Sequence, residues 1–309
     1  MKKIKKYQLI QDLLNQGLDY PKFTRRLASI RNSVDYSTLL EIVENFVKRS
    51  PIFKEYMFGT IFPNDSNALG GSRDFFLKPS SVESEISWIS LQIKYNKEKI
   101  QFFVSKKRIF EHLFLHGRYS EALNILENVR KELGVSIWYY ESKLLLYEYS
   151  NRTDDKFLLL SDINEKQGET HAGFVTSILH FISYRTARNL SAYKYDLDLQ
   201  NCFQRNRTDF QKSNCDYFLF KLNYFKHYNI DDFKTIFAFE NTNSLVDRYL
   251  TLIYLMQTMY IHGNNDEYIA NRALYLYSKT KDIMWIPLFA LVYPERIPDV
   301  YFDFEYLDI

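Results

Sequence analysis

The chain has 309 residues, of which 46% are hydrophobic and 25% charged, so it is long enough to bury one large or two ordinary cores. This composition excludes a disordered or fibrous protein. The formal net charge of +2 excludes the global basic field of a protein that coats nucleic acid. Nine glycines and seven prolines make up roughly 5% of the chain, against a usual share near 12%, which favours long helices and an all-α fold.

The compartment is predicted from cysteines and apolar stretches. Cys202 and Cys215 form no close pair and have no ligands at zinc spacing, so we expect a reducing compartment. Polar residues follow the N-terminal lysines, which is unlike a signal peptide. The most apolar stretches, Tyr249–Ile261 and Ile283–Tyr293, are shorter than the roughly 20 residues that span a bilayer. We therefore expect a cytoplasmic protein without a membrane contact.

The first part of the chain reads as a small helical unit, residues 1–62. Apolar residues recur there at steps of three and four, which is typical of helices. The expected helices are Ile4–Gln16, Pro21–Ile30, Tyr36–Lys48 and Pro51–Phe58. Turn-forming residues then concentrate between Pro63 and Ser72, so we expect residues 63–79 to be a linker or a functional loop.

A new helix is expected near Ser80, because Ser80 and Glu83 have the spacing of a capping box. Further along, Asp-rich segments at 151–157, 229–234 and 262–267 look like turns between helices, with acidic N-caps. No constant period joins these turns. Residues 80–293 are therefore expected to form an irregular array of antiparallel helical hairpins.

One turn of this array has a more specific sequence. In Phe114–Leu123 a glycine ends a helix, a tyrosine follows two places later, and an alanine three places after that. Gly117 suits the positive φ of a C-cap, Tyr119 would fill the cleft between two helices, and Ala122 is small where they approach. This stretch, with Trp138 at the start of the next helix, resembles the tetratricopeptide repeat. The resemblance implies a tetratricopeptide-like solenoid.

Residues that might carry chemistry form no complete site. His112 and His116 share a helix face, but Leu113 stands where a zinc protease has glutamate, and no third ligand is predictable. Asp196–Asp198 lacks a nucleotide-binding strand around it, and Gly70–Arg73 lacks the lysine of a phosphate loop. No nucleophile motif occurs, nor the Arg-x4–6-His spacing of a helical ribonuclease. We therefore expect no catalytic, cofactor-binding or metal-ligating residues.

The N-terminal unit leaves a second interpretation open. Residues 1–60 carry eleven Lys/Arg against six Asp/Glu, so nucleic acid could bind this basic unit. Tyr36–Phe46 resembles the last helix of the helix-turn-helix unit in peptide-sensing regulators of Gram-positive bacteria. Those regulators join a DNA-binding unit to a tetratricopeptide-like array at about this length. The preceding stretch lacks their polar turn and recognition helix.

The last segment, residues 294–309, is an acidic aromatic tail. Pro294 and Pro298 discourage continuation of the preceding helix, so one amphipathic helix cannot bury all the aromatic residues that follow. The tail either caps its own array or docks on a partner or second copy through acids that meet a basic surface. The candidate docking residues are Tyr301, Phe302, Phe304, Tyr306 and Leu307.

Arrays of helical hairpins leave a long surface that usually binds a peptide, a helix or another subunit. The sequence therefore predicts a non-catalytic protein–protein interaction subunit or adaptor of a bacterial multi-protein system, whose unusual composition suggests phage defence as the context. The expected partner is a protein or a second copy of the chain. The alternatives are a peptide-responsive DNA-binding transcriptional regulator and a helical enzyme without a recognisable motif.

Overall fold

The computed structural model describes residues 20–49, 54, 57–59, 61–70, 81–167, 173–205, 212–222, 228–263 and 266–298. Every regular element in these ranges is helical, which confirms the all-α class. The helices are α2 (Tyr20–Ser33), α3 (Tyr36–Arg49), α5 (Val82–Tyr95), α6 (Lys97–Leu115), α7 (Tyr119–Leu133), α8 (Ile137–Tyr149), α9 (Thr153–Gln167), α10 (Gly173–Arg185), α11 (Ala192–Arg205), α12 (Lys212–Lys221), α13 (Asp232–Glu240), α14 (Leu245–Ile261), α15 (Asp266–Thr280) and α16 (Ile286–Phe289). The described residues also form three short 3-10 helices, η1 (Ser66–Ala68), η3 (Ile283–Trp285) and η4 (Pro294–Arg296). The expected helix Ile4–Gln16 and most of Pro51–Phe58 lie outside the described residues.

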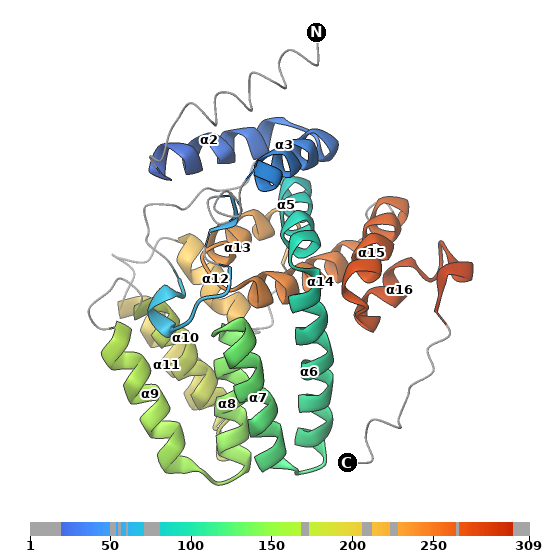
Figure 1. Ribbon diagram of the computed structural model, residues 1–309. Coiled ribbons are helices and arrows are strands. Elements are labelled where there is room, and N and C mark those ends of the chain that lie inside the picture. The colour runs from blue at the N-terminus through green and yellow to red at the C-terminus, as the bar shows by residue number, and fades with distance from the viewer. Residues whose placement is uncertain are drawn as a thin grey trace.

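Helices α2 and α3 lie across the end of α5 at the top of Figure 1. α2 buries Phe23, Leu27 and Ile30, which are spaced along one helical face, and they form a core with Trp88 and Leu91 of α5. Helices α2 and α3 thus share a hydrophobic core with α5.

Serine side chains cap the starts of α5 and α8. Ser81 accepts a hydrogen bond from the Ser84 N–H at 3.1 Å, so α5 begins one residue later than the Ser80 cap predicted. Ser136 caps α8 in the same way, with a distance of 3.0 Å to the Tyr139 N–H. Each cap satisfies a backbone donor that has no partner within the first turn of the helix.

Helices α6 to α9 run side by side in the lower half of Figure 1. Gly117 lies between α6 and α7 with a φ of 71°, a left-handed conformation that suits glycine. Ala122 is completely buried in the first turns of α7. Trp138, in the first turn of α8, packs edge-on against Phe103 of α6 with ring centroids 4.9 Å apart.

The segment from residue 61 to residue 70 is packed between two helix turns. The Pro63 carbonyl accepts a hydrogen bond from the Val135 N–H at 2.7 Å, and the Ile61 carbonyl accepts one from the Leu245 N–H at 2.8 Å. Ser66 and Leu69 are buried. The described part of the expected linker or functional loop therefore joins the turn before α8 to the turn before α14.

The helices α14 and α15 fold back onto α5, α6 and α8. α14 packs against α5 and α8, and α15 packs against α5 and α6. In a regular solenoid each repeat contacts only its neighbours, so these contacts join elements that a simple array would keep apart. Among the described residues, no helix combines the length and apolar character that crossing a lipid bilayer requires.

Candidate functional site: a polar cleft above a buried ion cluster

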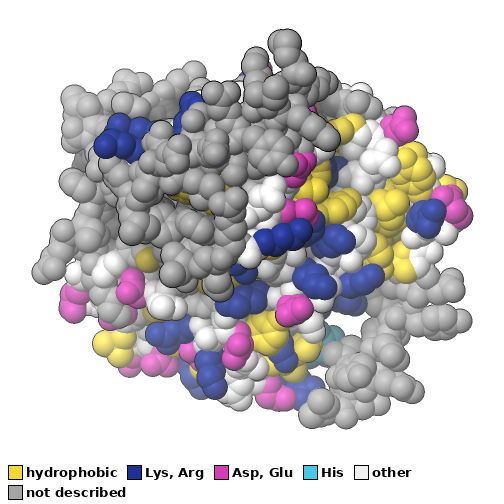
Figure 2. All heavy atoms as spheres, turned by 45° about the horizontal axis from the view of Figure 1, so that its top comes forward, with side chains coloured by type: hydrophobic (Ala, Val, Ile, Leu, Met, Phe, Trp, Pro, Cys, Tyr) yellow, Lys and Arg dark blue, Asp and Glu magenta, His cyan; other side chains and the backbone are white. Residues whose placement is uncertain are grey.

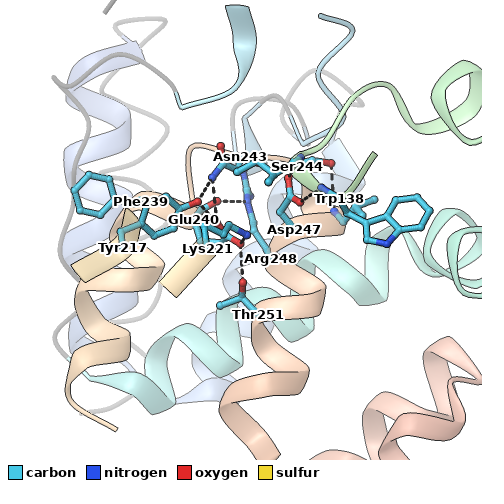
Figure 3. Close-up of polar contacts among 12 residues, drawn as sticks. Trp138, Tyr217, Lys221, Phe239, Glu240, Asn243, Ser244, Asp247, Arg248 and Thr251 are labelled. Carbon is cyan, nitrogen blue, oxygen red and sulfur yellow. Dashed lines mark hydrogen bonds and ion pairs between the residues drawn. The ribbon is translucent and has the colours of Figure 1, made fainter. Parts of the chain in front are cut away.

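Glu240, at the end of α13, accepts four side-chain hydrogen bonds in the interior (Figure 3). One carboxylate oxygen accepts from Lys221 Nζ at 2.5 Å and from Thr251 Oγ1 at 2.6 Å. The other accepts from the Tyr217 hydroxyl at 2.5 Å and from Asn243 Nδ2 at 3.0 Å. Because Glu240 is completely buried, these donors replace the water that it loses on folding.

Two arginines complete the cluster. Arg248 of α14 donates to the Asn241 and Asn243 carbonyls at 2.9 and 2.8 Å, and so closes the turn between α13 and α14. Arg31 of α2 donates to Glu85 of α5, and its guanidinium carbon lies 4.4 Å from the centre of the Trp88 ring. Burial lowers the pKa of Arg248 to about 10, which leaves it protonated at neutral pH. The cluster thus ties the N-terminal unit to the centre of the fold.

Asp247 of α14 connects the cluster to α8. Its carboxylate accepts the Ile137 N–H at 2.9 Å and the Trp138 N–H at 3.1 Å, two donors in the first turn of α8. Beside it, Asn243 Oδ1 accepts the Gly70 N–H at 3.0 Å and holds the end of the 61–70 segment. The turn between α13 and α14 and the start of α14 therefore position both α8 and the end of the 61–70 segment, which are distant in sequence.

The charges within this cluster balance. Burial alone would raise the pKa of Glu240 and lower that of Lys221, but both shift in the opposite direction because each lies beside the opposite charge. Glu240 and Asp247 are at most 1% exposed, so a substrate cannot reach either carboxylate. The buried ion cluster is therefore structural, and it fixes the positions of α8 and of the 61–70 segment.

A polar cleft of about 180 Å³ lies beside α8 and the 61–70 segment. Its walls come from loop residues 64–66, Arg130 of α7, Tyr139, Tyr140 and Lys143 of α8, and Leu159 and Asp162 of α9. Pockets for drug-sized ligands and cofactors usually measure ≈ 300–1,000 Å³. The cleft is smaller, and its size suits a single side chain of a partner.

Glu127 organises the donors of the cleft. It accepts hydrogen bonds from Lys143 Nζ at 2.6 Å and from the Tyr139 hydroxyl at 3.0 Å, and Arg130 lies 3.5 Å from its other oxygen. Burial alone would lower the pKa of Lys143, but the bonds to Glu127 and Tyr139 raise it above its usual value. Burial raises the pKa of Tyr140 to about 12. At neutral pH the inner cleft therefore holds two cations and one carboxylate, with two protonated phenols.

Arg130 is the more open of the two cations in the cleft. Its side chain is 52% exposed, whereas that of Lys143 is 12% exposed. A planar guanidinium has five N–H donors, and its contact with Glu127 leaves most of them directed elsewhere. Asp65 and Asp162, both exposed, lie at the rim. The inner cleft thus favours a hydrogen-bond acceptor, while its acidic rim disfavours a highly charged anion.

Of the repeat residues singled out from the sequence, Trp138 donates its backbone N–H to Asp247 of the ion cluster, and the other three lie elsewhere. Gly117, Tyr119 and Ala122 lie at the α6–α7 turn, where the Tyr119 ring is 5.7 Å from that of Phe114. The docking residues proposed for the tail lie outside the described residues: Tyr301, Phe302, Phe304, Tyr306 and Leu307.

Residues that were weighed as metal ligands form no site in the described part of the chain. The rings of His112 and His116 are 4.1 Å apart, and His116 Nδ1 lies 2.8 Å from the His112 carbonyl. Asp196 and Asp198 lie within α11. Groups of three or more His, Cys, Asp or Glu that could hold a metal ion do not occur among the described residues.

Neither the cluster nor the cleft was predicted from the sequence. A signal for the cluster was present, since Asp247 and Arg248 interrupt an otherwise apolar run at the start of α14. Buried charges of this kind need partners, and so predict contacts with distant residues. The cleft had no such signal, because its walls come from four separate elements.

Comparison with known proteins gives no relative. The chain matches no family model, and neither a curated protein nor a solved structure shows significant similarity to it.

Proposed function

We propose that the protein is a non-catalytic interaction subunit that binds a segment of another protein at the polar cleft. The observation that supports this most is the size of the cleft, about 180 Å³, together with its preformed donors. Pockets that hold one anchoring side chain are typical of protein interfaces, in which a few residues contribute most of the affinity.

The expected anchor is a polar side chain with an acceptor oxygen. Arg130 and Lys143 direct N–H donors into the cleft, and Leu159 supplies an apolar wall for the stem of the anchor. The rim acids Asp65 and Asp162 would oppose an anchor flanked by further acids. A glutamine or a single carboxylate in an otherwise neutral segment fits these conditions.

The proposed function also includes a scaffold class and a biological context. The resemblance of Phe114–Leu123 to a tetratricopeptide turn supports a hairpin array, a class of scaffold that binds protein segments. A bacterial multi-protein system acting in phage defence is the proposed context, with the cytoplasm as the proposed location.

Site-specific photo-crosslinking tests this function. A photoreactive residue in place of Leu159, in the cleft, is expected to give a discrete protein adduct in cells of the native host. The matched control is Phe157, which is exposed on the same helix but does not line the cleft. Equal adducts at both positions, or none at Leu159, would contradict a partner at the cleft.

One observation supports the second candidate, a DNA-binding regulator. Helix α2 has no acidic residue, and its Lys22 and Arg25 are exposed. A basic helix face of this kind can contact DNA phosphates. If this candidate is correct, Arg25→Gln will weaken binding to duplex DNA and reduce its salt dependence, whereas Lys131→Gln on α7 will not. No measurable binding by the full chain at low salt would eliminate it.

A further inference from the structure

Tyrosines and cations meet where α3, α5 and α15 come together, at residues that do not line the polar cleft. The Arg272 guanidinium lies 4.6 Å from the centre of the Tyr36 ring, and Lys279 Nζ lies 5.3 Å from that of Tyr275. Burial raises the pKa of Tyr275, and the neighbouring Tyr36 contributes to the shift. We call the surface formed by Tyr36, Lys94, Tyr95, Arg272, Tyr275 and Lys279 the basic corner.

The basic corner carries more positive charge than its acids neutralise. Glu44 pairs with Lys94 at 2.8 Å, but neither Arg272 nor Lys279 has an ion pair among the residues that the structure describes. Lys48 on α3 and Lys97 on α6 are further exposed cations, and the acids on these helices include Glu98 and also Glu83, which lies near the Tyr268 ring that Arg272 contacts. Figure 2 shows Lys and Arg side chains gathered beside hydrophobic side chains on the face where these elements meet. An anionic segment with aromatic side chains would complement this surface.

Residues 299–309 of the same chain have that composition. They contain four acids and no lysine or arginine, and the acids alternate with four aromatic residues. The acids are Asp299, Asp303, Glu305 and Asp308. Aromatic rings can pack against tyrosine rings while carboxylates meet the ammonium and guanidinium groups.

The described chain ends close enough for this contact to form within one molecule. The Tyr293 hydroxyl donates to Asn271 Oδ1 at 2.8 Å, one residue from Arg272 on α15. From there to Lys279 the helix rises roughly 12 Å, at 1.5 Å per residue. Eleven residues can span at most roughly 36 Å. The segment after Pro298 is therefore longer than the stretch of α15 between Asn271 and Lys279.

We propose that residues 299–309 bind the basic corner of their own chain. The contact is expected to cover a surface that a partner with an acidic aromatic segment would otherwise occupy, so such a partner would have to displace the tail. This interaction is independent of the polar cleft, and its failure would leave the proposed function intact.

Lysine labelling in the full chain provides the first test. With an amine-acetylating reagent and mass spectrometry, Lys279 is expected to react several-fold more slowly in the wild type than in Asp303→Asn/Glu305→Gln. Lys131, exposed on α7, should react equally in both proteins and serves as the internal control. Equal labelling of Lys279 in both proteins would overturn the proposal.

A peptide supplies the second test. A fluorescent peptide of residues 297–309 should bind a chain truncated after Pro298 more tightly than the full chain, whose corner is already occupied. Arg272→Gln/Lys279→Gln in the truncated chain should weaken binding most strongly at low salt, whereas Lys131→Gln/Lys194→Gln should not. Equal binding to full and truncated chains would overturn the proposal. So would a fall from dimer to monomer mass on truncation, since the tail would then bind a second copy.

Discussion

The carboxylate of Asp247 on α14 accepts the backbone N–H of Ile137, 110 residues earlier in the chain, at 2.9 Å. This contact fixes the first turn of α8, and α8 supplies three of the residues that line the polar cleft. The shape of the cleft therefore depends on the buried carboxylate of Asp247, which does not itself line the cleft.

The pH dependence of stability should show the cost of burying Asp247. Burial raises its pKa to about 6 from an ordinary value of 3.8, despite two backbone donors. Between about pH 4 and pH 6 the folded chain holds a proton that the unfolded chain releases, so the free energy of unfolding falls as pH rises, by up to about 3 kcal/mol. Asp247→Asn cannot titrate and provides the reference. Urea unfolding of both proteins should show the wild type losing stability relative to the variant over this range. A difference that is constant or that grows with pH would contradict the assignment.

The Lys221–Glu240 pair should behave as one unit. Lys221→Met leaves the buried Glu240 carboxylate without its cation, which is expected to cost about 3–5 kcal/mol. The double variant Lys221→Met/Glu240→Gln removes both charges and should be more stable than Lys221→Met alone. A double-mutant cycle from urea unfolding measures this coupling. Additive effects would show that the two groups stabilise the fold independently.

Two glycines with the same backbone conformation should differ sharply in tolerance to alanine. Gly134 and Gly117 have φ values of 70° and 71°, but a Cβ on Gly134 would lie 2.0 Å from the Pro63 carbonyl oxygen, whereas one on Gly117 meets nothing within 4 Å. Gly117→Ala is expected to cost about 1–2 kcal/mol for the left-handed conformation alone. Gly134→Ala should cost clearly more, because the 61–70 segment must move. Equal thermal stability of the two variants would mean that this segment does not pack as described.

Ala122 provides a test of the α6–α7 crossing. The residue is completely buried, so Ala122→Leu should overpack the interface and cost about 1–3 kcal/mol. Ser120→Leu adds a similar side chain at an exposed position of the same helix and should change stability by less than about 0.5 kcal/mol. If Ala122→Leu is as stable as the wild type, the hairpin register inferred from the sequence is wrong.

Local patterns in the sequence predicted where the helices begin and end, but they did not predict how the helices pack together. The apolar spacing in α2 and α3 placed both helices within a few residues of their observed bounds, because one buried face imposes that period. The start of α5 was wrong by one residue, since adjacent serines can both serve as caps and only the fold selects Ser81.

The cleft and the ion cluster could not be predicted in the same way. Asp247 contacts α8 across more than a hundred residues, and α14 and α15 return to pack on α5 and α6. Such contacts depend on which helix faces meet, and periodicity within one helix does not specify that. The polar cleft likewise exists only because loop 64–66 is fixed beside α8 and α9.

Quantitative affinity purification from the native host tests the central claim most directly. Arg130→Ala removes an exposed cationic donor of the cleft, and Arg118→Ala, at the α6–α7 turn, is a matched control outside it. If the cleft binds a protein segment, at least one protein will co-purify with the wild type and with Arg118→Ala, and will be strongly depleted with Arg130→Ala while the variant remains folded. Identical co-purifying proteins for all three chains would contradict the cleft as the interaction site.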